Sequence, residues 1–178
     1  AFFNLNIAES IMLNQLATLA ERIGGSNELV DNWLYNRKQL LVHYYNLVGI
    51  TPGKGSYMQL NEKALDEFCH NLVEYLSAGH FNIYERIIGE MEGTSPLLAS
   101  TQIYPLLEAN TLEIMEYYDS SLENAIDDDN YIGFQQALSD IGEALAARFT
   151  LEDKLIVLAF DNNLKESAND ESGMARPA

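Results

Sequence analysis

A glutamate and a histidine three residues apart could act together as metal ligands. Glu67 and His70 have this Glu-x-x-His spacing, which di-iron helical bundles use twice, together with two further glutamates. The other two histidines, His43 and His80, do not follow a glutamate by three residues. The sequence therefore holds only half of such a site, and we expect no metal.

An acidic run, Asp127 to Asn130, resembles the start of a calcium-binding loop. The sixth position, which requires glycine, is Ile132, and the twelfth, which requires glutamate, is Leu138. We therefore interpret the run as a turn between helices. No serine or cysteine stands in a recognisable nucleophile motif, and the only cysteine, Cys69, falls among apolar helix positions. We predict no cofactor and no enzymatic activity.

The segment around Glu67 and His70 has the spacing of an amphipathic α-helix. Its apolar residues recur at steps of three and four and lie opposite an acidic face. They are Leu65, Phe68, Cys69, Leu72, Tyr75 and Leu76. Asn61 is a candidate cap for the helix start. We expect Gly79 to end the helix by adopting the left-handed conformation.

Helical spacing covers most of the remaining chain. It predicts helices from Leu13 to Ile23, Leu29 to Val48, Leu106 to Ile126 and Tyr131 to Leu158, with a loop from Glu92 to Pro96 and a possible restart of the last helix near Thr150. The predicted fold is all-α: an antiparallel four-helix bundle of long amphipathic helices with shorter flanking helices. We expect a domain at residues 12–160, a poorly ordered extension at 1–11 and a disordered polar tail at 161–178.

Three residues of the second predicted helix differ in their expected surroundings. Trp33, the only tryptophan, is interpreted as a core anchor rather than a recognition residue. Arg37 and Lys38 form a small basic island, for which two interpretations stay open. They could pair with acids of the central helix or remain in water.

The charge is strongly acidic. Twenty-seven acidic residues against ten basic ones give a net charge of −17, and no Lys or Arg lies between Ile87 and Ala147. Such a charge argues against binding nucleic acid directly and against docking on anionic membranes, and it favours a basic protein partner. The alternative is that it only keeps the protein soluble. The single cysteine and the lack of a membrane-length apolar run favour the cytoplasm.

Long blocks of the sequence resemble the Rsd/AlgQ family of bacterial anti-sigma factors, over the span from Met12 to Leu158. The blocks include LLVHYYNLVGITPGK (Leu40–Lys54), SYMQLNEKALDEFC (Ser56–Cys69), YLSAGHFNIYERI (Tyr75–Ile87), YYDSSLENAID (Tyr117–Asp127) and FQQALSDIGEALAARF (Phe134–Phe149). The resemblance implies an all-α protein that binds the primary sigma factor of RNA polymerase, mainly its region 4. It would keep that factor from core polymerase and promoter DNA, which favours alternative sigma factors in stationary phase. The resemblance also allows a regulatory adaptor that binds the phosphotransfer carrier HPr, a ppGpp hydrolase, or both.

The resemblance places an acidic sigma-binding residue at Glu74. Asp66, His70 and Ser77 lie within two turns of it at steps of three to four, and Phe81 offers an apolar anchor beyond Gly79. From the helix alongside, Leu29 and Asn32 complete the predicted site. Each has a plainer alternative: the polar residues would be solvated surface positions, and Phe81 a core residue.

Overall fold

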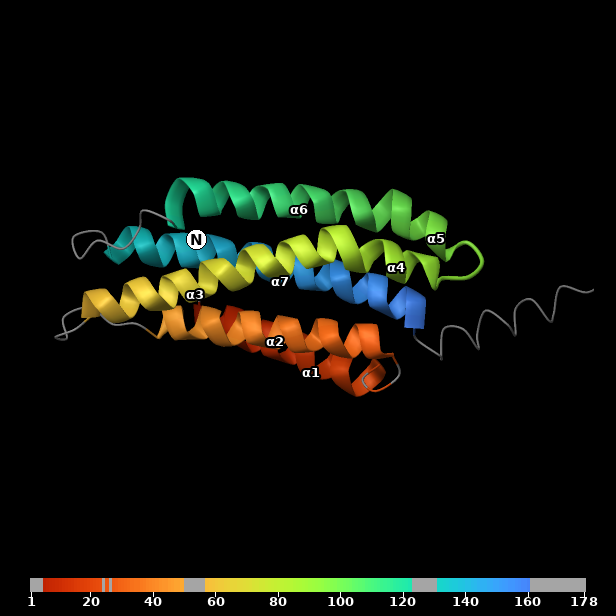
Figure 1. Cartoon of the computed structure of the whole chain (residues 1–178), viewed down its shortest axis with the longest axis horizontal. Coiled ribbons are helices and arrows are strands. Elements are labelled where there is room, and N and C mark those ends of the chain that lie inside the picture. The colour runs from red at the N-terminus through yellow and green to blue at the C-terminus, as the bar shows by residue number, and fades with distance from the viewer. Residues whose placement is uncertain (1–4, 24, 26, 50–56, 123–130, 161–178) are drawn as a thin grey trace, which may run out of the picture.

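The computed structural model describes residues 5–23, 25, 27–49, 57–122 and 131–160 of the 178-residue chain. Within these residues the backbone forms helices and short turns, and no β-strand occurs. The all-α prediction is therefore confirmed. The helices lie with their long axes close to one direction and give the molecule an elongated shape (Figure 1).

Helices α1 (Leu5–Ile23) and α2 (Glu28–Val48) pack against each other. Between them, Gly25 has a φ of +80°, which favours glycine. Asn27 caps α2, because its side-chain oxygen accepts from the backbone N–H groups of Leu29 and Val30 at 2.8 and 3.4 Å. The cap is therefore Asn27, the residue directly before α2. Helix α1 begins at Leu5, inside the segment that the sequence suggested would be poorly ordered.

The prediction that Gly79 ends the central helix is wrong. Helix α3 (Tyr57–Ala78) passes into a π-helical segment (Gly79–Ile83) and then into α4 (Tyr84–Gly89). The helical path is thus continuous. The reason for glycine here is space, since a β-carbon at Gly79 would lie 2.8 Å from the hydroxyl oxygen of Tyr84. Glycine allows a close approach at this point, and the left-handed turn is not needed.

A similar arrangement occurs in the next helical stretch. Helix α5 (Ser95–Leu98) leads through a π-helical segment (Ala99–Ile103) into α6 (Tyr104–Tyr117), which a further π-helical segment (Tyr118–Leu122) extends. The predicted loop that ends at Pro96 is therefore shorter than expected. Pro105 lies in the first turn of α6, where the wider π-helical turn before it accommodates a residue that cannot donate a backbone hydrogen bond.

Helix α7 (Tyr131–Phe160) is one continuous helix, so the predicted restart near Thr150 is wrong. It contacts α1, α2, α4 and α6 and lies at the centre of the packing. Large apolar side chains of α7 and of the helices around it fill the core, among them Trp33, Phe68, Leu72 and Phe149, each at most 1% exposed. The prediction that Trp33 anchors the core is confirmed.

The basic pair on α2 separates into two environments. Lys38 is exposed, whereas Arg37 is fully buried and pairs with Glu152 and Asp153 of α7. Pairing with acids of the central helix and residence in water are therefore both wrong for Arg37, because the acids that it pairs with come from α7. The predicted turn at 127–130 and the predicted tail lie outside the described residues.

Candidate partner-binding site

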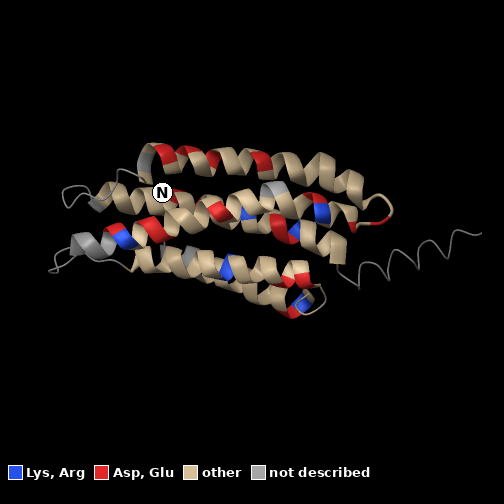
Figure 2. Cartoon of the chain, in the orientation of Figure 1, with Lys and Arg blue, Asp and Glu red and all other residues tan. Residues whose placement is uncertain are grey.

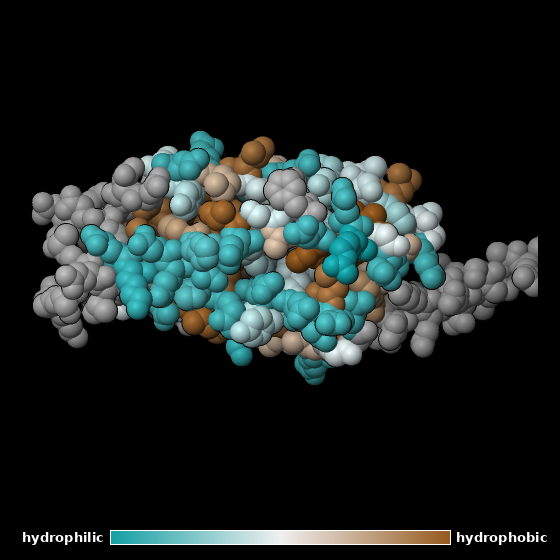
Figure 3. All heavy atoms as spheres, viewed as in Figure 1, coloured by the Kyte–Doolittle hydropathy of each residue, from teal (hydrophilic) through white to brown (hydrophobic). Residues whose placement is uncertain are grey.

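The predicted site residues on α3 form an exposed stripe. Asp66, His70, Glu74 and Ser77 are all exposed and follow one another at steps of four, four and three. Side chains at such steps lie on one face of a helix. In Figure 3, hydrophilic residues gather along this part of the surface. The stripe is therefore available to a partner.

A close side-chain contact within α3 joins two of these residues. His70 Nε2 lies 3.3 Å from Glu74 Oε1, and the side chains of both residues are largely exposed. Glu67, the other half of the Glu-x-x-His spacing, instead lies 3.8 Å from His43 Nδ1 and 4.0 Å from Lys63 Nζ. Glu67 and His70 thus contact different neighbours. In the described part of the chain, no three His, Cys, Asp or Glu residues are arranged to hold a metal ion.

The other predicted residues are placed differently. On α2, Asn32 is exposed, but Leu29 is half-buried and packs against the core. Leu29 is therefore at most a partial contributor to the surface. Phe81 belongs to the π-helical segment, and its side chain lies outside the described residues.

A groove of about 480 Å³ runs between α2 and α3 and contains two of the predicted residues, Glu74 and Ser77. Its remaining lining consists of Asn36, Gln39, Asn71, Tyr75, Ala78 and Asn82. Four of these carry side-chain amides, and Glu74 is the one charged residue in the lining. An amide both donates and accepts hydrogen bonds, so the groove can bind a polar surface with either kind of group.

The predictions omitted the amides that line this groove. The α2 wall could have been found from the spacing, because Asn32, Asn36 and Gln39 stand at steps of four and three and such residues share a helix face. What the spacing alone does not give is which α2 residues lie opposite Glu74. In the structure, Asn36 and Gln39 line the groove together with Glu74, whereas Asn32 is not among the lining residues.

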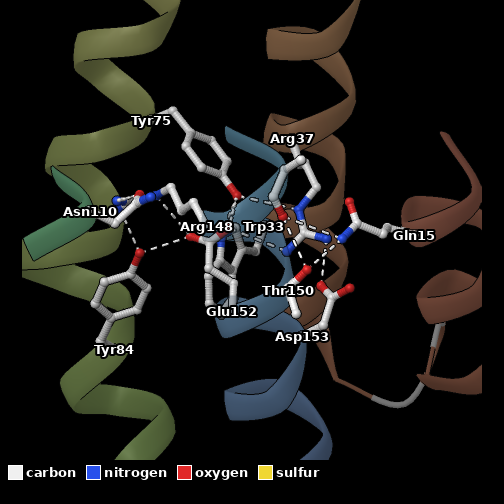
Figure 4. Close-up of polar contacts among 11 residues, drawn as sticks. Gln15, Trp33, Arg37, Tyr75, Tyr84, Asn110, Arg148, Thr150, Glu152 and Asp153 are labelled. Carbon is white, nitrogen blue, oxygen red and sulfur yellow. Dashed lines mark hydrogen bonds and ion pairs between the residues drawn. The ribbon is translucent and has the colours of Figure 1, made fainter. Parts of the chain in front are cut away.

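Beneath the groove lies a buried polar network centred on Glu152 of α7 (Figure 4). Its carboxylate accepts from the hydroxyl of Tyr75 at 2.5 Å and from that of Tyr84 at 2.8 Å. Arg37 Nη2 lies 3.3 Å from Oε1, and Arg148 Nε lies 3.4 Å from Oε2. A buried carboxylate needs such partners, because an unpaired charge in the interior is costly.

The two arginines extend this network to other helices. Arg37 Nη1 donates to Asp153 at 2.6 Å. Arg148 donates to the hydroxyl of Tyr84 at 2.6 Å and to that of Thr111 on α6 at 2.8 Å. Two guanidinium groups thus face two carboxylates. With four formal charges in balance, we interpret the cluster as structural: it joins α2, α3, α4, α6 and α7 in one register.

Burial changes the ionisation of the network. Removal from water raises the pKa of the Tyr75 and Tyr84 hydroxyls, and the neighbouring charge of Glu152 raises both further. Desolvation also raises the pKa of Asp153, against the opposing effect of Arg37. For Arg37, desolvation works against the charged form, but Tyr75, Glu152 and Asp153 together raise its pKa above the usual range. The tyrosines therefore stay protonated and act as hydrogen-bond donors.

A second groove, of about 440 Å³, lies between α1 and α7. It contains none of the predicted residues. Its acidic residue, Asp153, is already held by Arg37. We therefore take the groove between α2 and α3, hereafter the α2–α3 groove, as the candidate site.

The distribution of charge supports a basic partner over an acidic one. Acidic side chains mark α3 and α6 in Figure 2, whereas basic ones are few. Of the basic side chains, Arg37 and Arg148 are fully buried and contribute nothing to the surface. No helix among the described residues is long and apolar enough to span a membrane.

This chain is similar to known proteins of the following family. Residues 12–160 match the family described as "Regulator of RNA polymerase sigma(70) subunit, Rsd/AlgQ". The chain is 74% identical over 167 residues to the regulator of sigma D from Enterobacter sp. (strain 638), covering 94% of this chain and 100% of that protein. It is 66% identical over 167 residues to the regulators of sigma D from Salmonella arizonae and Salmonella newport, with the same coverage.

Proposed function

Because this chain belongs to the Rsd/AlgQ family of regulators of the RNA polymerase sigma(70) subunit, we propose that it is an anti-sigma factor that binds region 4 of the primary sigma factor. By occupying region 4 in the cytoplasm, it keeps the sigma factor from core polymerase and from promoter DNA. Alternative sigma factors then gain access to polymerase in stationary phase. We further infer that the long helices form an antiparallel four-helix bundle, which the packing of α2 on α3 and of α6 on α7 supports.

The chemistry of the two surfaces supports this partner. Region 4 reads promoter DNA, so it carries basic side chains suited to phosphate groups. This chain has a net charge of −17, which attracts a basic partner and raises the rate of encounter. Long-range attraction does not by itself select a binding site, and the exposed stripe on α3 supplies one.

The observation that carries the proposal is the position of Glu74. Glu74 is exposed and lines the α2–α3 groove. Its carboxylate can bind a basic side chain of the partner, and the amides that line the same groove can form hydrogen bonds with the polar groups around that side chain. Asp66 and His70 extend the contact along α3. We propose that the partner lies along this stripe and inserts polar side chains into the groove.

The test is titration of the full chain into fluorescently labelled sigma region 4 at low and moderate salt. We expect saturable one-to-one binding that weakens as salt increases. Glu74→Lys should weaken it by roughly tenfold or more, because it places a like charge against a basic surface. Glu108→Lys is the matched control, since Glu108 is exposed on α6 and the substitution changes the net charge equally.

The outcomes separate contact from overall charge. Equal weakening by both substitutions would mean that only the general field matters and that the groove is not the site. No binding at micromolar concentration, with helicity intact by circular dichroism, would contradict the sigma-binding proposal. The same titration with HPr and with a ppGpp hydrolase would then test the alternative, a regulatory adaptor.

A further inference from the structure

We propose that Tyr75 is a positioning residue for the α2–α3 groove: it fixes the spacing of the two walls by tying α3 to a buried carboxylate and to α2. The proposal rests on the proposed function of this groove. Tyr75 was predicted as an apolar core position, and its hydroxyl gives it this second role.

Tyr75 belongs to both the groove and the core. It lines the groove beside Glu74 and Ala78, although the residue is only 5% exposed. The ring is held from below by an edge-to-face contact with Phe149 of α7, with ring centroids 6.0 Å apart. Its hydroxyl points into the interior, toward Arg37 and Trp33 (Figure 4). One side chain therefore connects the groove with the buried network.

The hydroxyl of Tyr75 makes three hydrogen bonds. It donates to Glu152 Oε1 at 2.5 Å and accepts from Trp33 Nε1 at 3.0 Å and from Arg37 Nε at 3.4 Å. Glu152 comes from α7, and both donors come from α2. The bonds thus join three helices at one oxygen atom.

The donors and the α2 wall of the groove occupy neighbouring positions. Asn36 and Gln39 line the groove, and Trp33 and Arg37 stand on the same two turns of α2 with their side chains buried. Holding Trp33 and Arg37 against Tyr75 therefore also holds Asn36 and Gln39 opposite Glu74 and Ser77. A site whose walls are fixed before binding loses less entropy when the partner docks.

Tyr75→Phe removes only the oxygen and leaves the ring in place. Glu152 keeps its hydrogen bond from Tyr84 and its two arginines, so the charges of the network remain balanced. The two hydrogen bonds that Trp33 and Arg37 of α2 donate to α3 are lost. We expect α3 to sample several positions against α2. The fold stays intact, but the two walls of the groove are no longer held at one spacing.

Tyr44→Phe is the matched control. Tyr44 is another buried tyrosine, and its hydroxyl donates to the backbone carbonyl of Leu138 at 2.8 Å. It does not line the groove. Both substitutions remove one buried hydroxyl and lower stability, but only Tyr75→Phe removes a link at the groove. A merely structural role for Tyr75 would make the two variants alike in binding.

The first experiment measures binding of both variants to labelled sigma region 4, at a temperature where circular dichroism shows both folded. We expect Tyr75→Phe to weaken binding by about tenfold and Tyr44→Phe by less than about twofold. Trp33→Phe, which removes one donor to the same hydroxyl, should give a smaller loss of the same sign. It also serves as the test variant if Tyr75→Phe does not fold. Equal affinities for the wild type and Tyr75→Phe would overturn the proposal.

A second experiment needs no partner. Spin labels are placed at Lys38 on α2 and Val73 on α3, both exposed and next in sequence to groove residues, in a Cys69→Ala background. We expect Tyr75→Phe to broaden the distance distribution between the labels and Tyr44→Phe to leave it unchanged. An unchanged distribution in Tyr75→Phe would overturn the positioning role. If the wild type fails to bind region 4, the proposed function is wrong, and this distance measurement still decides the role of Tyr75.

Discussion

Arg37 of α2 and Asp153 of α7 form an ion pair of 2.6 Å, Nη1 to Oδ1, with the guanidinium fully buried. The same guanidinium lies 3.3 Å from Glu152 and 4.6 Å above the ring of Phe149. One α2 side chain therefore satisfies two acids on α7, and its loss would leave both without this partner.

Arg37→Leu should lower the free energy of unfolding by about 3–5 kcal/mol, because it leaves buried negative charge uncompensated. Chemical denaturation followed by circular dichroism would measure the change. Lys38→Leu is the control, since Lys38 is exposed, and its effect should stay within about 0.5 kcal/mol. Similar losses for the two variants would contradict the structural role of the network.

Alkaline pH should destabilise the protein. Burial raises the pKa of Tyr44, Tyr75 and Tyr84, so the folded state keeps three protons that the unfolded chain releases from about pH 10 upward. Stability contributed by these hydroxyls is complete below pH 10 and is lost as the pH rises beyond it. The slope should approach about 1.4 kcal/mol per pH unit for each tyrosine. Urea titrations between pH 9 and 11 measure this slope, and Tyr44→Phe should reduce it by about 1.4 kcal/mol per pH unit, the contribution of one tyrosine.

Gly142→Ala should destabilise the protein through contact with Tyr44. A β-carbon at Gly142 would collide with the hydroxyl of Tyr44 and lie 2.9 Å from its Cζ. Overpacking of this kind costs about 1–3 kcal/mol. Adding Tyr44→Phe should recover part of the loss, since it removes the nearest atom. Gly89→Ala is the control, because a β-carbon there meets no atom within 4 Å, and thermal unfolding compares all four proteins.

Alanine substitutions at Leu29 and at Asn32 should change the stability of the protein by different amounts. Leu29 is half-buried against the core, so Leu29→Ala should lower stability by roughly 1–2 kcal/mol, less than for a fully buried leucine. Asn32 is exposed, and Asn32→Ala should change stability by less than about 0.5 kcal/mol. Denaturation gives stability and region 4 titration gives binding. A loss of binding with Asn32→Ala alone would assign this end of α2 to the interface, and no loss would remove it.

Much of the fold could be predicted because helix formation leaves a short-range pattern. Apolar residues three and four apart mark the buried faces of α2, α3 and α7, whereas the predicted cap at Asn61 is wrong, because α3 begins at Tyr57 and Asn61 lies inside it. The pattern failed at Gly79, where a glycine that usually ends a helix serves instead to admit Tyr84 and Arg148. Which of these roles a glycine has depends on neighbours far along the chain.

The candidate site could be predicted on one wall only. The spacing along α3 gave the exposed stripe with Glu74, because those residues belong to one helix. The opposite wall, with Asn36 and Gln39, depends on how α2 lies against α3. The burial of Arg37 likewise depends on Glu152 and Asp153, more than 100 positions later in the chain. No local pattern contains such distant pairings.

The π-helical segment at Gly79–Ile83 allows the carboxylate of Glu152 to accept hydrogen bonds from two tyrosines. Tyr75 and Tyr84 are nine residues apart, and at about 100° per residue a regular α-helix would direct them to nearly opposite sides. The wider turn takes up one extra residue, which rotates α4 back until both hydroxyls reach Glu152. Deleting one residue from this segment would leave the tyrosines eight residues apart, and a regular α-helix would then direct both hydroxyls to similar sides without a wide turn. The π-helical geometry, and not only the number of residues between the tyrosines, therefore sets the rotational phase of α4.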